Sequence, residues 1–169
     1  QGYTALHLAA EAGQEGCLRR LVAAGAALDA VGASEKSDTP LHASCRAGNP
    51  GCARLLLEAG ANVHQRNRGG AGGTALFIAC QEGHADCARL CLEAGANVKA
   101  AVENGATPLH IACHNGHTDC ARLCIEAGAN MDAATSQGAT PLGMACLHGH
   151  TDCARLCLQA GANVNSAAE

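Results

Sequence analysis

The chain has 169 residues, a formal net charge of −4 and no block of basic residues, which argues against nucleic acid as its ligand. Tyr3 and Phe77 are its two aromatic residues, so Ala, Leu, Cys and Gly must fill any core; this favours thin layers of closely packed helices. No apolar run approaches the roughly 20 residues that a membrane span requires, and no signal-peptide pattern is visible. We therefore expect no membrane insertion.

One stretch of the sequence is repeated along the chain. TPLHIACHNGHTDCARLCIEAGANM begins at Thr107, and most of it returns, position for position, as TPLGMACLHGHTDCARLCLQAGANV at Thr140. Looser copies begin at Thr4, Thr39 and Thr74, so the spacings are 35, 35, 33 and 33 residues. Self-similarity at this period is typical of helical solenoids. The sequence therefore predicts five units within a single domain, approximately 1–30, 31–65, 66–99, 100–132 and 133–165.

Each unit predicts two short helices. Three units begin with Thr-Pro, which places an N-cap hydroxyl before a residue that tolerates the first helical position. This helix should run for about eight residues and end near a glycine. The second helix, for example Thr118 to Ala127, follows at once and ends at another glycine. The segments between units are polar or rich in small residues, and those before Thr39 and Thr74 are two residues longer than those before Thr107 and Thr140.

These units resemble the ankyrin repeat. The resemblance rests on Gly-x-Thr-Pro-Leu-His, two small residues, Gly-His, an apolar helix and Gly-Ala-Asn-Val, and it covers residues 2 to about 165. It implies an all-α solenoid, in which L-shaped helix-turn-helix units with β-hairpin-like fingers stack into a curved array. It also implies a protein-binding scaffold without enzymatic activity, catalytic site or cofactor.

Twelve cysteines recur at equivalent positions of the units. Equivalent helices of a stack lie about 8–10 Å apart, which is too far for disulfides between equivalent cysteines. Free thiols fit a reducing, intracellular compartment, and the cytoplasm is the expected one. Cysteines in the last three units are expected to converge, three to a core layer, where they replace aliphatic residues: Cys80, Cys87 and Cys91; Cys113, Cys120 and Cys124; Cys146, Cys153 and Cys157. A zinc- or redox-sensing site is the less favoured alternative, since His114 and His117 are close in sequence.

Histidines and arginines also recur. By the resemblance, two sets of histidines form structural hydrogen bonds between neighbouring loops and units: His7, His42 and His110, and His84, His117 and His150. Phe77 and Gly143 stand in the first set's position, so that bond should be absent there. Five arginines line the second helices, where nearby acidic residues favour a solvated face over a docking surface: Arg19, Arg54, Arg89, Arg122 and Arg155.

The predicted function is binding of another protein through the concave face and finger tips. The candidate residues differ from unit to unit, whereas the packing residues do not: Lys36, Asp38, Arg46, Arg68, Gln81, Glu82, Glu103, Asn104, His114, Asn115, Gln137, Leu147 and His148. Charge reversal at Arg46 and His114 should weaken partner capture without lowering the melting temperature. The alternative is a structural or spacer subunit of a larger permanent assembly that docks by its ends or convex side. We expect a longer chain, because the last unit keeps an apolar outer side with Cys157 and Leu158.

Overall fold

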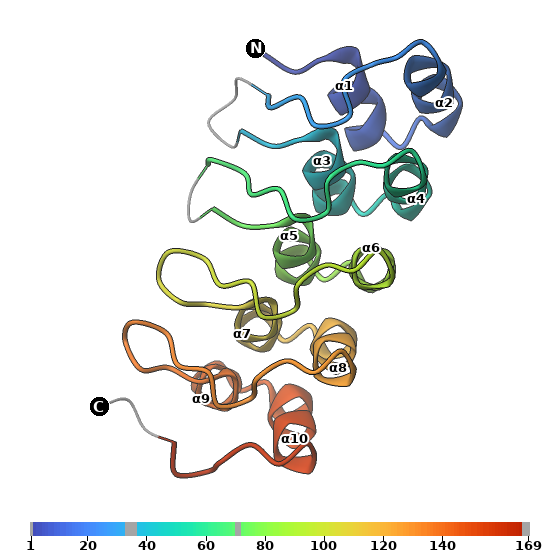
Figure 1. Ribbon diagram of the computed structural model, residues 1–169. Helices are drawn as coiled ribbons and strands as arrows, with labels where there is room; N and C mark the ends of the chain where they lie inside the picture. The colour runs from blue at the N-terminus through green and yellow to red at the C-terminus, as the bar shows by residue number, and fades with distance from the viewer. Residues whose placement is uncertain (1, 33–36, 70–71, 167–169) are drawn as a thin grey trace.

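Two parallel rows of helices build the protein. The computed structural model describes residues 2–32, 37–69 and 72–166. Within these ranges the ten helices form five consecutive pairs: α1 (Ala5–Glu11) and α2 (Glu15–Ala23), α3 (Pro40–Ala47) and α4 (Pro50–Glu58), α5 (Ala75–Glu82) and α6 (Ala85–Glu93), α7 (Pro108–Asn115) and α8 (Thr118–Glu126), α9 (Pro141–Leu147) and α10 (Thr151–Gln159). The odd-numbered helices form a first row and the even-numbered helices a second, each helix contacting the next in its row (Figure 1). The predicted all-α solenoid is confirmed.

Every first-row helix begins after a threonine with extended backbone, as predicted: Thr4, Thr39, Thr74, Thr107 and Thr140. The Thr140 hydroxyl, for example, accepts a hydrogen bond from the Gly143 N–H at 3.1 Å. This bond satisfies one of the N–H groups that a helix leaves without a partner at its start. The helices α3, α5 and α7 end directly before glycines with positive φ, whereas α1 and α9 end one residue earlier.

The loops between helix pairs project as fingers from the side of the first row (Figure 1). Each finger is closed at its base by one backbone N–H to C=O bond of 2.9–3.0 Å: Gly32 to Asp38, Asn67 to Gly73, Val102 to Ala106 and Thr135 to Ala139. The first two pairs are six residues apart in sequence and the last two are four apart, so the two extra residues lie above the base. Among the described residues, β pairing is limited to an isolated bridge between Arg66 and Thr74. Over the residues that the structure describes, the fingers are therefore hairpin-like loops without β-strands.

The buried cysteines join neighbouring helix pairs. All twelve are free thiols, ten of them buried, while Cys17 and Cys146 are exposed. Three contacts of 3.6–3.7 Å between Sγ atoms link a first-row helix to the second-row helix of the following pair: Cys45 to Cys91, Cys80 to Cys124 and Cys113 to Cys157. The predicted grouping within one unit therefore differs from the observed contacts, because α3 packs on α6 and α5 on α8 as well as on their own partners.

Two further findings bear on the alternatives. In the part of the chain that the structure describes, no group of three or more His, Cys, Asp or Glu side chains could hold a metal ion. None of the described helices has the length and apolar character needed to span a membrane.

Candidate partner-binding surface

The turns after the first-row helices are fixed by side chains from the following helix pair. His117 Nε2 lies 3.2 Å from the Gln81 carbonyl oxygen, and Asn115 Nδ2 donates to the same oxygen at 2.8 Å. His150 Nε2 likewise lies 3.0 Å from the His114 carbonyl oxygen. At the first junction Asn49 has this role and donates to the carbonyl oxygens of Ala10 and Glu11. These bonds set the register between neighbouring pairs, which is the structural role predicted for His117 and His150.

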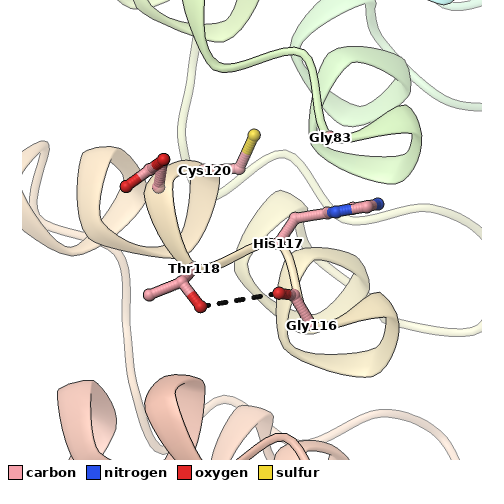
Figure 2. A pocket seen from close by; sticks show the side chains of 6 residues that line it. Gly83, Gly116, His117, Thr118 and Cys120 are labelled. Atoms are coloured by element: carbon pink, nitrogen blue, oxygen red, sulfur yellow. Dashed lines mark hydrogen bonds between the residues drawn. The ribbon is translucent and has the colours of Figure 1, made fainter.

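A hollow of about 300 Å³ lies beside one such junction (Figure 2). The His117 ring extends toward Gly83, where an added Cβ would lie 2.6 Å from its Nδ1 atom. Gly83 also has φ +81°, a conformation that favours glycine. The Thr118 hydroxyl donates to the Gly116 carbonyl oxygen, and Cys120 is buried among the helices. Because these groups hold the turn in place, we interpret the hollow as part of the packing between neighbouring helix pairs and not as a ligand site.

The predicted binding residues of α3 and α5 form a polar network. The Asp38 carboxylate is fully buried and accepts hydrogen bonds from Arg46 at 3.0 and 3.2 Å and from Asn67 at 2.8 Å. Arg46 also donates to Glu82 at 3.3 Å, and the Gln81 side chain donates to the same carboxylate at 3.1 Å. Burial, the largest single influence, lowers the pKa of Arg46, but the hydrogen bond with Asp38 and the negative charges of Asp38 and Glu82 together outweigh it, so the pKa is raised overall. The Asp38 side chain therefore positions Arg46 and does not face solvent.

The predicted binding residues of α7 and α9 are less occupied. The rings of His114 and His148 meet edge to face, with centroids 4.1 Å apart. Burial, followed by the neighbouring imidazoles of His148 and His150, lowers the pKa of His114. Leu147 is 77% exposed directly before His148. The structure thus places His114, Leu147 and His148 at the C-terminal ends of the neighbouring helices α7 and α9.

The remaining candidates lie on the fingers. Arg68, Glu103, Asn104 and Gln137 are exposed. The Asn104 side chain accepts a hydrogen bond from the Ala106 N–H of its own finger. The Asn104 backbone carbonyl oxygen accepts one from the Ser136 N–H of the next finger. The bond from Ser136 links two neighbouring fingers. Lys36 lies outside the described residues.

Sequence reasoning missed one hollow beside these candidates. It has a volume of about 170 Å³ and is lined by Asn104, Ala106, His110, Ile111, His114 and Met144. Ile111 and Met144 are not among the predicted binding residues, yet both are apolar and only half-buried. The available signal was spacing, since Ile111 and His114 are three apart and share a helix face.

The other recurrent residues are structural or solvated. The Nε2 atoms of His7, His42 and His110 lie 2.9–3.2 Å from finger carbonyl oxygens, as predicted. Burial lowers the pKa of His42 and His110. Phe77 instead packs against Ile78, Val102 and Ala106. The second-row arginines are exposed, and Arg89 and Arg155 pair with Asp86 and Asp152 on their own helices.

Comparison with known proteins gives a single family. A family model described as ankyrin repeats (3 copies) matches residues 1–67 and 76–168, and one described as ankyrin repeats (many copies) matches residues 45–90. No curated protein matches the chain. Ankyrin repeats are generally protein–protein interaction modules and typically have no enzymatic activity. Ten helices in five stacked pairs and the matches along most of the sequence lead to one conclusion: the chain belongs to the ankyrin-repeat family.

Proposed function

We propose that the protein binds another protein through its inner surface, defined here as the fingers and the C-terminal ends of the first-row helices. The observation that carries the proposal is Leu147, which is 77% exposed at the end of α9 beside the exposed His148. Met144 on the same helix and Ile111 on α7 are also only half-buried and line one hollow with His114, and apolar surface rimmed by polar residues is typical of a contact surface. Arg68, Glu103, Asn104 and Gln137 extend the same surface onto the fingers.

The frame beneath this surface favours binding. The bonds of the junctions and finger bases fix the backbone from which these side chains project. A preformed surface loses little conformational entropy when it binds, so more of the contact energy appears as affinity.

The structure changes which residues make a clean test. Arg46 holds the buried Asp38 carboxylate, so its charge reversal would destabilise the fold as well as alter the surface. A variant with Leu147→Asp and Glu103→Lys changes exposed side chains of the inner surface only. A matched variant with Arg54→Glu and Arg122→Glu changes two exposed side chains of the second row.

The measurement is affinity capture from the source cells, quantified by mass spectrometry, with melting temperatures recorded for each variant. We expect proteins captured by the parent and the second-row variant to be lost from the inner-surface variant, while all three melt within a few degrees because surface changes shift stability by only about 0.5 kcal/mol. Equal capture by all three would contradict the proposal.

A second candidate is an assembly subunit that docks by its ends. One end carries a hollow of about 320 Å³ with Leu8, Cys17 and Leu21 in its lining, and Leu8 is 55% exposed. The other end carries a hollow of about 380 Å³, whose lining includes the exposed Cys146, Leu158 and Val164. Light scattering separates the candidates: a monodisperse monomer favours the inner surface, whereas solubility only with co-expressed subunits favours docking by the ends.

A further inference from the structure

The hollow between α7, α9 and the finger that precedes α7 has an apolar floor. Ile111 projects from α7 and Met144 from α9, and Ala106 closes the finger side. Its volume of about 170 Å³ is comparable to the roughly 150 Å³ of an apolar cavity that holds benzene. The hollow is therefore large enough for one aliphatic side chain of a bound segment.

Imidazoles stand at the rim of this hollow. His114 belongs both to its lining and to the edge-to-face pair with His148, and the His148 ring centroid is 6.3 Å from that of His150. His150 Nε2 is engaged with the His114 carbonyl oxygen, and the buried His110 is engaged with two finger carbonyl oxygens. His114 and His148 are thus the histidines of this group whose ring nitrogens have no hydrogen-bond partner among the described residues.

Charged residues occur on several of the elements packed around the histidine pair. His114 lies on α7, which packs against α5, α8 and α9, and α9 packs against α10. Those helices and the two adjacent fingers contribute Glu82, Asp119, Arg122, Glu126, Asp152, Arg155, Lys99, Glu103 and Asp132. The electrostatic influence on the pKa of His114 comes from His148 and His150 alone. Among the described residues no carboxylate forms an ion pair with either imidazole, so a protonated pair would present positive charge to a partner.

We propose that this site binds an extended acidic segment of a partner protein, with an aliphatic side chain of the segment in the hollow and a neighbouring carboxylate against His114 and His148. The inference rests on the proposed function, which it narrows to one part of the inner surface and one chemistry of partner. Charge complementarity selects an acidic segment over a basic one, and the apolar floor selects an aliphatic neighbour.

The proposal fixes the sign of a pH effect. A carboxylate placed within about 4–6 Å favours the protonated imidazole, so binding takes up protons and raises the pKa of His114 from its lowered value in the free protein. Affinity should therefore rise as the pH falls from about 7.5 to about 5.5, where the carboxylate of the segment is still ionised. One unit of coupled pKa shift corresponds to roughly tenfold in affinity.

The test uses a library of random peptides displayed on phage and selected for binding to the full chain. The selection is done at about pH 5.5, which is below the ordinary histidine pKa of about 6.5. We expect enrichment of peptides that pair Asp or Glu with Leu, Ile or Met. An enriched peptide should bind roughly tenfold tighter at about pH 5.5 than at about pH 7.5. The variant with His114→Gln and His148→Gln should lose this difference, and Met144→Gln should weaken binding at both pH values.

His64→Gln is the matched control, because His64 is exposed in the loop after α4 and the substitution is chemically the same. It should keep the full pH effect. NMR titration of the His114 imidazole should show a higher pKa with the selected peptide than without it. Enrichment of basic peptides, or binding that is equal at the two pH values, would overturn the inference. If the Leu147 and Glu103 variant nevertheless loses its cellular partners, the proposed function stands while this inference fails.

Discussion

The two halves of the inner surface differ in how far their polar groups are already satisfied. Around α3 and α5, the buried Asp38 accepts from Arg46 and Asn67, and Arg46 also contacts Glu82. Around α7 and α9, His114 and His148 contact mainly each other, beside an open hollow and the exposed Leu147. In the first half Asp38, Arg46 and Glu82 bond to one another, whereas in the second the side chains of His114, Leu147 and His148 form no such bonds among the described residues. Variation between repeats thus marks two different roles.

The junctions show the same contrast. Asn49 joins the first two pairs with two direct amide donations, of 3.0 and 2.8 Å. At the corresponding turn between the last two pairs, the His150 imidazole contacts the His114 carbonyl oxygen. The junction beside the open hollow therefore includes an imidazole ring, whereas the junction at the other end of the array includes an amide.

The largest expected effect comes from breaking the Asp38 network. Arg46→Leu leaves a fully buried carboxylate with Asn67 as its remaining side-chain donor. Removing one partner of a buried ion pair costs about 3–5 kcal/mol. We expect a loss of this size in the free energy of unfolding, measured by urea titration with circular dichroism.

Arg89→Leu supplies the comparison, because its pairing with Asp86 is exposed and such pairs contribute about 0–1 kcal/mol. Adding Asp38→Asn to Arg46→Leu should recover part of the loss by removing the buried charge. If Arg46→Leu lost no more stability than Arg89→Leu, the pairing of Arg46 with the buried Asp38 carboxylate would not stabilise the fold.

The second effect concerns the junction at the other half. Gly116 has φ +75°, and an added Cβ would lie 2.5 Å from His150 Nδ1. Gly149 has φ +73° with no atom within 4 Å of such a Cβ. Both Ala substitutions incur the left-handed backbone penalty of about 1–2 kcal/mol, but only Gly116→Ala displaces the His150 ring from the His114 carbonyl oxygen. Losing its hydrogen bond should add about 1 kcal/mol. Equal urea midpoints for the two variants would mean that His150 contributes nothing to the register.

Local signals in the sequence were sufficient for the solenoid. Thr-Pro marks helix starts and glycine marks helix ends, and the 33–35-residue spacing repeats these signals along the chain. The helices begin where the signals place them. The stagger between rows is not local. It is set by packing between pairs, so the sequence could not show that Cys80 would meet Cys124 of the following pair instead of Cys87 or Cys91 of its own.

The same limit applies to the candidate site. Unit-to-unit variation indicated positions that the structure places on the fingers and at the ends of the first-row helices, but it could not separate buried from exposed ones. The buried Asp38 carboxylate accepts from Arg46 and Asn67, and the sequence does not show that these distant residues meet. Ile111 and Met144 escaped notice because exposure of an apolar residue depends on how the neighbouring finger closes.

The smallest expected effect is the contribution of His114 to the pH dependence of folding. Its pKa is lowered in the folded protein, so the folded state binds fewer protons than the unfolded state below about pH 6.5. This contribution is present above that pH and is lost as the pH falls through the lowered pKa; His42 and His110 act with the same sign in every variant. We expect His114→Gln to match the parent in urea midpoint at about pH 7.5 and to lose less stability than the parent at about pH 5, with His64→Gln indistinguishable from the parent. Acidification would then weaken the fold slightly while strengthening the capture of an acidic segment. Opposite signs for folding and binding distinguish a binding histidine pair from one that only packs, and a parallel loss of both would assign the pair to packing.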